Sequence, residues 1–566
     1  MRLAFSRSFM FWALAIGIAL RVVLAFRMPI IEHDGTMYAS LASAILSGDW
    51  VHGLSPFWPP LYPLMIAGVV AVAHAFGVAL TPPVFEGCAR AVSLLCGIAL
   101  LAPLYWLGRR VLGQRGAQWA LLFALFHPRL VQFSAAALSE MPFMLMILVG
   151  LAALTAAWRI EREQTPTALP TRLDVAELPR ARLWSAASVS SRALTLEIAA
   201  GVAFGLGYLI RPEALLIAAA LWVAGMAIRR GEGIRARLSP AFLISVLAVS
   251  APFIMFLHGE LGYWSLGEKG PYNFWREYRS EYATLYPVPQ GLSERASESP
   301  ELVVAIPPEP VGVTGFIIHK PGAFLWRYLR NLATIVVSTF PVAVYHLFFL
   351  LAIVGVIGVS GRLWWPVLVA IALFPFLYAA FSVDRRFYVP VIPLVVLISA
   401  RGMSSIETWF TQRVRPQARA SWISYGICAV LMLAGISYSL HHGSIDDAPE
   451  HRAAGEWLAA AWRAQAPADD SRPVHGRPIV MSRKPWVAFY ANGLLAELPD
   501  GPVEEVLARV RSKQCDILVI DERWIAATRP QLIFLLDPAK APAGLHVLYE
   551  RSVPRRIILY DVRAMR

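Results

Sequence analysis

Long apolar runs recur along the chain, and they constrain its fold more than any other feature. The runs cover residues 9–26, 84–107, 116–127, 137–158, 194–209, 214–228, 241–257, 341–359, 365–380, 387–400 and 422–440. Because a spanning helix needs about 20 mostly apolar residues, the sequence predicts a polytopic all-α membrane protein with about eleven transmembrane helices, some of them short or broken. Only 16% of the 566 residues are charged and 57% are hydrophobic, which excludes an ordinary soluble protein of this length.

Arginine is concentrated in alternate connections between these runs. Clusters lie at 109–115, 159–192, 229–237, Arg362 and 401–419, all on the side shared with Arg2 and Arg7. Because cytoplasmic loops are enriched in Lys and Arg, we expect the amino terminus to be cytoplasmic and the first run to be an uncleaved signal anchor. The same rule explains the net charge of +13 without a nucleic-acid partner.

Three segments are then expected outside the membrane: 28–83, 258–340 and 441–566. The first contains two helix-like stretches, 36–46 and 61–76. Counting the second as a span would reverse the side of every later loop, so we expect both to lie near the outer surface. The second outer segment is polar and aromatic over 258–324 and is long for a connection, which is typical of a binding loop or lid.

The composition changes after residue 441, where the charges become balanced and the apolar runs shorten. Helical spacing at 450–461 and 503–511 alternates with short strands at 478–481, 516–520, 546–549 and 557–560. We expect a small extracytoplasmic α/β domain over 441–566, with a role in interaction or lid support. Its sequence contains no Gly-rich phosphate loop, GxSxG or HExxH motif.

A small polar island, Glu32-His33-Asp34-Gly35, follows the first apolar run. A carboxylate at a membrane surface, next to a stretch rich in Trp, Tyr and Pro, is well placed for a reaction on a lipid-linked substrate. An Asp in an outer loop can also be an ordinary solvated acid. The surrounding motifs favour the functional interpretation.

Five motifs together resemble the GT-C superfamily of polytopic glycosyltransferases, family 39 type, which includes protein O-mannosyltransferases and lipid A aminoarabinose transferases. They read EHDGTMYASLASAILSGDW, PPLYPLMIAG, HPRLVQFSAAALSEMPFMLMI, GLGYLIRPEALLIA and DRRFYVPVIPLVVLISARGM, in the family's order across most of 1–403. The resemblance implies a bacterial GT-C module over 1–440. It also implies transfer of a sugar from a polyprenyl-phosphate donor to an acceptor hydroxyl on the outer face of the cytoplasmic membrane.

Two carboxylates match the family's acidic positions. Asp34 matches the acid at the start of the first outer loop, which the resemblance implies is the base for the acceptor hydroxyl. Glu140 matches a Ser-Glu position and is implied to orient acceptor or sugar hydroxyls. Its other interpretation is a helix N-terminal carboxylate favoured by the helix dipole.

Four cations are candidates for binding the donor phosphate: Arg211, Lys269, Arg385 and Arg386. An Arg on the outer side runs against the positive-inside tendency, and its planar fork suits phosphate oxygens. Pairing with Glu213 or Glu140 is the alternative for Arg211, and lipid headgroups are the alternative for the adjacent pair. Lys269 is also compatible with a solvated loop position.

The sugar and acceptor pocket is expected to include His33, Tyr38, Trp58, Tyr62 and His127. Aromatic faces stack on sugar rings, although the same residues are typical of the membrane-interface belt. The Glu32-His33-Asp34 run suits a divalent ion only if a distant ligand joins it, so no metal site is predicted and metal dependence stays open. The four scattered Cys residues indicate neither disulfides nor zinc.

The expected partners are a polyprenyl-phosphate sugar, a lipid, glycan or protein acceptor, and membrane lipids. The alternative function is a transporter or flippase for a lipid or solute, which would favour internal repeats and polar residues at the membrane midplane. No such repeat is visible, and the ionisable groups gather at the outer edge. A scaffold whose outer domain binds a partner would explain the tail but not the ordered motifs.

The topology predicts opposite outcomes for two reporter fusions. A reporter that is active only in the periplasm should be active after Arg566 and inactive near Gln164, because the charged loops place these points on opposite sides. Reporter activity in living cells measures this directly. The reverse pattern would mean that the spans are miscounted, most simply at 61–76.

Overall fold

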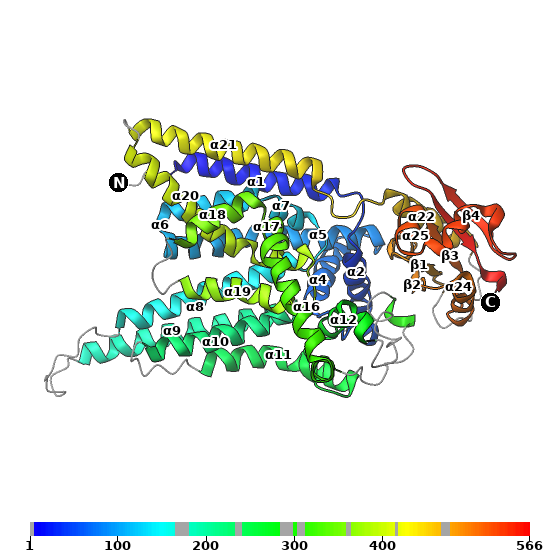
Figure 1. The fold of residues 1–566 in the computed structure, drawn as a ribbon, viewed down its shortest axis with the longest axis horizontal. Helices are drawn as coiled ribbons and strands as arrows, with labels where there is room; N and C mark the ends of the chain where they lie inside the picture. The colour runs from blue at the N-terminus through cyan, green and yellow to red at the C-terminus, as the bar shows by residue number, and fades with distance from the viewer. Residues whose placement is uncertain are drawn as a thin grey trace.

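The computed structural model describes residues 5–164, 180–231, 240–282, 298–302, 312–357, 364–413, 417–465 and 476–565. A bundle of long helices forms most of the molecule, and a small sheet lies beyond one end of it (Figure 1). Parts of the predicted cytoplasmic loops, including Arg172, Arg235, Arg237, Arg362 and Arg415, lie outside the described residues.

The bundle is built from helices whose apolar content matches a bilayer. Within the described residues, six are long and apolar enough to cross a membrane, and a bent pair makes up to seven. Shorter apolar helices accompany them, so the count of eleven stays a prediction. The main helices are α1 (Arg7–Arg27), α5 (Pro82–Ala99), α6 (Leu101–Phe126), α8 (Glu140–Gln164), α9 (Arg180–Tyr208), α10 (Glu213–Gly231), α11 (Pro240–Leu261), α18 (His346–Ile357), α19 (Trp365–Tyr378), α20 (Ile392–Arg413) and α21 (Gln417–His442).

The helix α6 reverses direction at Gly113, whose φ of 75° suits glycine. A Cβ on Gly108 would lie 3.2 Å from the Cα of Ala117. Nine residues of straight helix would separate these positions by about 13 Å, so the chain must turn back between them. The two halves correspond to the separate segments that the sequence predicts at 84–107 and 116–127, with the Arg109–Arg115 cluster at the turn.

The end of the bundle that holds this turn has its own polar cluster. Glu407 of α20 accepts hydrogen bonds from Arg115 Nε at 3.0 Å, from Trp119 at 3.2 Å and from Ser424 at 2.6 Å. Figure 1 shows the amino terminus at this end and the sheet at the other. The Arg109–Arg115 cluster and the polar island of residues 32–35 therefore lie at opposite ends of the bundle.

The first outer segment covers the end of the bundle nearest the sheet. It contains α2 (His33–Leu46), α3 (Trp50–Gly53) and α4 (Leu61–Ala75). The Leu61 N–H donates to the Leu209 carbonyl at the end of α9 (2.8 Å). Figure 1 shows α2 and α4 beside each other, between the bundle and the sheet and across the bundle direction.

The second outer segment contains short helices and a bend. These are α12 (Lys269–Glu277), α13 (Arg279–Tyr282), η2 (Pro300–Leu302), α15 (Val313–His319), α16 (Pro321–Thr334), the π-helix η3 (Ile335–Thr339) and α17 (Phe340–Ala343). The pair Pro321–Ala343 and His346–Ile357 is bent by 112°. Asn331 of α16 donates to Glu277 of α12 (3.1 Å), so α16 holds the carboxyl end of α12 in place.

The carboxyl-terminal part is a five-stranded mixed sheet with order β2-β1-β3-β5-β4. The strands are β1 (Ile479–Ser482), β2 (Leu494–Glu497), β3 (Ile517–Asp521), β4 (His546–Arg551) and β5 (Ile557–Asp561). The first three are parallel, and β5 is antiparallel to β3 and β4. Four strands lie where the sequence predicts them, whereas β2 was missed because its run LLAE is short and has low strand propensity.

Helices cover both faces of this sheet, which is why its central strand β3 is buried on both sides. Ile517 and Val519 pack with Leu458 on one face, and Leu518 and Ile520 pack with Val506 on the other. The remaining elements are α22 (Pro449–Gln465), α23 (Trp486–Tyr490), α24 (Val503–Ser512), α25 (Glu522–Thr528), η6 (Pro530–Leu536), η7 (Pro538–Lys540) and η8 (Arg563–Met565).

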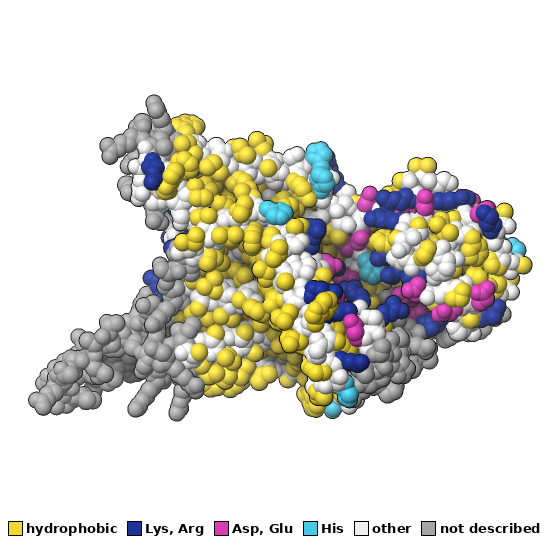
Figure 2. All heavy atoms as spheres, viewed as in Figure 1, with side chains coloured by type: hydrophobic (Ala, Val, Ile, Leu, Met, Phe, Trp, Pro, Cys, Tyr) yellow, Lys and Arg dark blue, Asp and Glu magenta, His cyan; other side chains and the backbone are white. Residues whose placement is uncertain are grey.

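The surface divides into an apolar and a charged part (Figure 2). Hydrophobic side chains cover the visible face of the bundle, as a lipid-facing surface requires. Charged side chains gather where the bundle meets the carboxyl-terminal part and over that part itself.

Candidate active site at the outer end of the bundle

Asp34 lies in the first turn of α2, where a carboxylate is favoured by the helix dipole. The next residue explains how this turn can approach the bundle so closely. A Cβ on Gly35 would lie 2.8 Å from the Ala137 carbonyl oxygen, so only glycine fits without displacing backbone. Asp34 is thereby placed against the segment that begins α8.

Two cations from distant parts of the chain reach Asp34. Arg386, from the 3₁₀ helix η5 (Arg385–Val391), lies 2.9 Å from the Asp34 carboxylate. Lys269, the first residue of α12, lies 3.5 Å away. Burial alone would raise the pKa of Asp34, but the charges of Arg386 and Lys269 outweigh it and hold the pKa well below its usual range. Asp34 is therefore ionised in the structure.

Arg386 also binds Glu140, and this links Asp34 to a second buried cluster. Glu140 is fully buried at the start of α8, and its carboxylate is 2.7 Å from Arg386 and 3.2 Å from Arg211. Arg211 in turn lies 3.1 Å from Glu213, which also accepts a hydrogen bond from Tyr378. Three cations and three carboxylates thus form one alternating network, in which the charges cancel.

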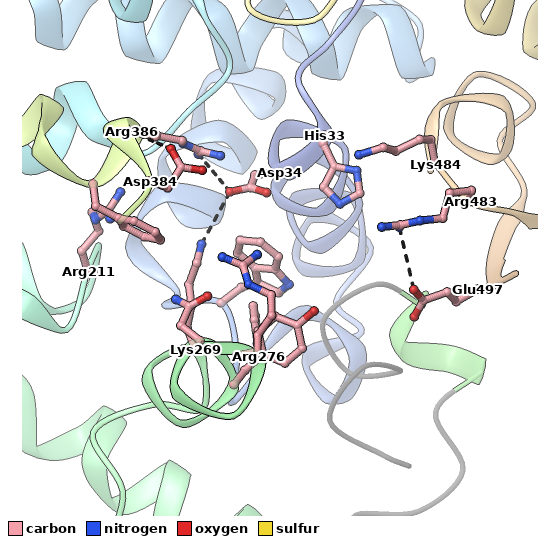
Figure 3. Close-up of a pocket in the computed structure, with 15 residues that line it drawn as sticks. His33, Asp34, Arg211, Lys269, Arg276, Asp384, Arg386, Arg483, Lys484 and Glu497 are labelled. Atoms are coloured by element: carbon pink, nitrogen blue, oxygen red, sulfur yellow. Dashed lines mark hydrogen bonds and ion pairs between the residues drawn. The ribbon is translucent and has the colours of Figure 1, made fainter. Parts of the chain in front are cut away.

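The network borders a cavity of about 260 Å³ (Figure 3). Its walls come from the bundle, both outer segments and the sheet domain. They are formed by His33, Asp34, Phe57, Trp58, Arg211, Lys269, Tyr272, Asn273, Arg276, Asp384, Arg386, Phe387, Arg483, Lys484 and Glu497.

The sheet domain fixes the backbone just before Asp34. Trp486 donates from its indole nitrogen to the Ile31 carbonyl (2.7 Å), and the Ile31 N–H donates to the Tyr490 hydroxyl (3.1 Å). The His33 N–H donates to Asp446 (3.1 Å). Since these partners all lie after residue 441, the tail is part of the site rather than a separate appendage.

The α5 helix holds the same segment from the bundle side. Arg90 donates to the Ile30 carbonyl (2.8 Å) and pairs with Glu86 (2.7 Å). Glu86 also accepts from Tyr490 (2.9 Å), which joins the bundle to the sheet domain. The entry into α2 is therefore clamped between two domains.

His33 lies at the cavity wall between two groups of cations. Burial and the positive charge of Lys484 lower its pKa to about 3, and Arg483 and Arg386 act in the same direction. The ring is therefore neutral at physiological pH, and its edge faces Trp486 with ring centroids 6.5 Å apart. A neutral imidazole can donate and accept hydrogen bonds beside Asp34.

The other predicted site residues divide between the cavity and its surroundings. Trp58 lines the cavity, and Tyr38 lies behind it, donating to Ser139 (3.1 Å). The Tyr62 hydroxyl binds Ser93 (2.9 Å), and His127 contacts the Val344 carbonyl (3.2 Å); neither lines the cavity. Arg385 is exposed and does not line the cavity, whereas its neighbour Arg386 pairs with Asp34.

Sequence reasoning missed the cations Arg276, Arg483 and Lys484. The last two directly follow β1, at the carboxyl end of a parallel strand. Ligands of α/β sheets bind at such carboxyl ends, so a basic pair after a predicted strand was the available signal.

The side chains of the consecutive residues Glu32, His33 and Asp34 do not converge on a common metal position. Glu32 accepts from the Ala137 N–H (2.7 Å), while Asp34 faces the cations. Among the described residues, no group of three His, Cys, Asp or Glu side chains could hold a metal ion. The structure therefore assigns no ligands to the divalent ion that the sequence left open.

The fold is that of the GT-C glycosyltransferases, as solved structures show. ArnT from Cupriavidus metallidurans bound to undecaprenyl phosphate is 14% identical, with a TM-score of 0.54 over 98% of each chain. The oligosaccharyltransferase AglB from Archaeoglobus fulgidus, in complex with an inhibitory peptide and a dolichol-phosphate, is 13% identical. Its TM-score is 0.56 over 91% of this chain and 70% of that one.

An apo form of the Archaeoglobus fulgidus oligosaccharyltransferase gives a TM-score of 0.58 at 13% identity, over 98% of this chain and 75% of that one. A further crystal structure of that protein is a complex with Zn and sulfate. No protein-family model matches the chain, and no curated protein matches it in sequence. The predicted GT-C fold, with its small carboxyl-terminal sheet, is thus confirmed.

Burial of Glu32 gives the site a testable pH dependence. The side chain is 2% exposed, and burial raises its pKa to about 7 despite the opposing charge of Arg90. Since the fold favours the protonated acid, the free energy of unfolding should fall as pH rises from about 4.5 to 7. Glu32→Gln, which keeps an acceptor for Ala137, should raise the thermal unfolding midpoint in detergent at pH 8 and change it little at pH 4.5.

Glu504→Gln is the matched control, because Glu504 is an exposed carboxylate of the sheet domain. This change should have much less effect at either pH. A Glu32→Gln variant that is less stable than the unmodified protein at pH 8 would show instead that Glu32 is ionised and stabilised by Arg90.

Proposed function

We propose that this chain is a membrane glycosyltransferase that transfers a sugar from a polyprenyl-phosphate donor to an acceptor hydroxyl. One observation carries the proposal: a partly buried carboxylate, Asp34, is paired with two cations in a cavity at the end of an apolar helical bundle. The fold supports it, because ArnT was crystallised with undecaprenyl phosphate and AglB with a dolichol-phosphate. We assign the chain to the family 39 type on its motifs.

In this reaction, Lys269, Arg386 and Arg211 bind the donor phosphate. Guanidinium groups bind phosphate oxygens through two parallel hydrogen bonds, and charge on the departing phosphate is stabilised by cations already in place. Lys269 also lies 4.2 Å from the Trp58 ring centroid, which helps to orient its ammonium group. Trp58 and Phe57 offer flat faces to the sugar.

Asp34 serves as the base. The acceptor hydroxyl oxygen bonds to the anomeric carbon, the bond from that carbon to the phosphate oxygen breaks, and the hydroxyl proton goes to Asp34. Polyprenyl phosphate is released. A carboxylate held by two cations is a weak base, so the donor phosphate has a second effect: by competing for Lys269 and Arg386, it makes Asp34 more basic.

The polyprenyl chain lies along the apolar surface near α16. Leu325, Trp326 and Leu329 of this helix are more than half exposed, as expected of side chains that meet lipid. Arg327 of the same helix pairs with Glu281 at 2.5 Å. Glu281 belongs to α13, and Arg327 also donates to the carbonyl of Glu277, the last residue of α12. These contacts keep the lipid-facing helix beside α12, which carries Lys269.

The orientation that follows from the loop charges places this cavity on the periplasmic side of a bacterial inner membrane. The donor, membrane lipids and a lipid, glycan or protein acceptor are then the partners. The transporter alternative has less support, because the charged network lies at the end of the bundle and the similar structures include an oligosaccharyltransferase.

Replacing Asp34 tests the assignment of the base. Asp34→Asn should abolish release of free polyprenyl phosphate from a polyprenyl-phosphate sugar in the presence of acceptor, because an amide does not accept the proton. Donor binding should persist, since Lys269 and Arg386 remain. Asp49→Asn is the control, as Asp49 belongs to the same outer segment but pairs with the exposed His52. Normal turnover by Asp34→Asn would rule this residue out.

The adjacent arginines offer a matched test of phosphate binding. Arg386→Lys should weaken binding of polyprenyl phosphate at least about tenfold, because the ammonium keeps the charge and loses the fork. Arg385→Lys should change nothing, since Arg385 is exposed and does not line the cavity. Binding is measured with polyprenyl phosphate and with polyprenol, which lacks the phosphate. Equal behaviour of the two variants would place phosphate recognition elsewhere.

A further inference from the structure

The cations on the donor side of the cavity are already neutralised by the protein. Arg386 pairs with Asp34 and Glu140, Arg211 pairs with Glu140 and Glu213, and Lys269 pairs with Asp34. A single donor phosphate can bind there by exchanging these partners. The cations on the donor side therefore provide a binding site for one anion.

The cations supplied by the sheet domain are different. Within the described residues, no carboxylate forms an ion pair with Lys484; its ammonium lies over the Trp524 ring at 4.2 Å. The negative charges of Asp446 and Asp34 act on Lys484 only from a distance. Arg483 is 3.9 Å from Glu497, and its Nε is buried without a hydrogen-bond partner in the structure.

These two cations occupy the opposite side of the cavity from the donor group. Figure 3 shows Asp34 and His33 in the middle, with Lys269 and Arg386 on one side and Arg483 and Lys484 on the other. Both groups of cations act on His33. A ligand held by Arg483 and Lys484 would therefore lie next to the base without occupying the donor phosphate site.

An incompletely paired cation in a partly buried position is unfavourable unless a ligand supplies the counter-charge. Arg483 presents a planar fork and Lys484 a point charge, and both suit a phosphate or carboxylate group. Neither contact is needed to bind one donor phosphate. These two cations are therefore available for a second anion.

We propose that Arg483 and Lys484 form an oxyanion site for the acceptor, which carries a phosphate or carboxylate close to the hydroxyl it presents to Asp34. This inference rests on the proposed function, because it assigns the acceptor's chemical class. The oxyanion anchors the acceptor and does not react, because the new bond still forms between the hydroxyl oxygen and the anomeric carbon. His33, neutral and between the two groups, is placed to bind the same hydroxyl.

The test measures binding without turnover. Purified full-length protein is saturated with undecaprenyl phosphate to fill the donor phosphate site and is then titrated by calorimetry with glucose 6-phosphate, glucuronate or glucose. We expect an anionic probe to bind and glucose not to bind. Preference for glucose 6-phosphate indicates a phosphorylated acceptor, and preference for glucuronate indicates a carboxylated one; either supports the site.

Variants assign the binding to these side chains. Arg483→Gln and Lys484→Gln should each weaken anion binding roughly ten- to a hundredfold, and Lys484→Arg should retain it. Lys540→Gln is the matched control, because Lys540 is an exposed lysine of the same domain that pairs with Asp537. If Lys484→Gln does not fold, Arg483→Gln and Lys484→Arg still decide the matter.

Two results would overturn the inference: equal binding of glucose and both anionic probes, or unchanged anion binding in Arg483→Gln and Lys484→Gln. These results leave the proposed function standing if the protein transfers sugar to a neutral acceptor. Conversely, specific anion binding with no release of polyprenyl phosphate from any donor would remove the transferase function and keep the oxyanion site.

Discussion

Arg386 joins the two carboxylates on which the candidate site depends, one fully and one partly buried. Its guanidinium binds Asp34 from the first outer segment and Glu140 from the start of α8. Burying either carboxylate alone would cost several kcal/mol, so the shared cation is what permits both to lie beneath a cavity. Because Arg386 lies 246 residues after Glu140, this pairing joins parts of the chain that only the folded bundle brings together. The chemistry is thus coupled to the whole fold.

A second constraint acts on the backbone that presents Asp34. Trp486, Tyr490 and Asp446 bind the segment before α2, and Arg90 holds it from the other side. The long outer segment is attached to the same domain, since Ser299 forms backbone and side-chain hydrogen bonds with Leu495. Arg90, Asp446 and the α23 pair Trp486 and Tyr490 therefore fix one short stretch of backbone from three distant parts of the chain.

The sequence predicted the fold well because apolar runs and loop charges report directly on burial in lipid. The reversal at Gly113 and four of the five strands follow from such local signals. The candidate site was harder to predict from the sequence than the fold. Asp34, Glu140, Arg211 and Arg386 come from the family motifs and meet in the structure, and Lys269, which belongs to no motif, joins them. His127 and Tyr62 come from the same motifs but do not line the cavity. Arg483 and Lys484 were missed because tertiary contacts, rather than a motif, bring the sheet domain to the cavity.

The division of the cavity wall between two domains has a consequence for how such proteins diversify. The bundle supplies the buried network, in which each side chain has several partners and substitution at one position disturbs the others. The loop after β1 bears Arg483 and Lys484. The strands of its sheet pack in two clusters separate from the bundle core, which Trp486 and Tyr490 of α23 join. Changes in this loop can alter which molecule is recognised while the network beneath stays intact. The substrate selectivity of such a protein can therefore change faster in evolution than its catalytic residues do.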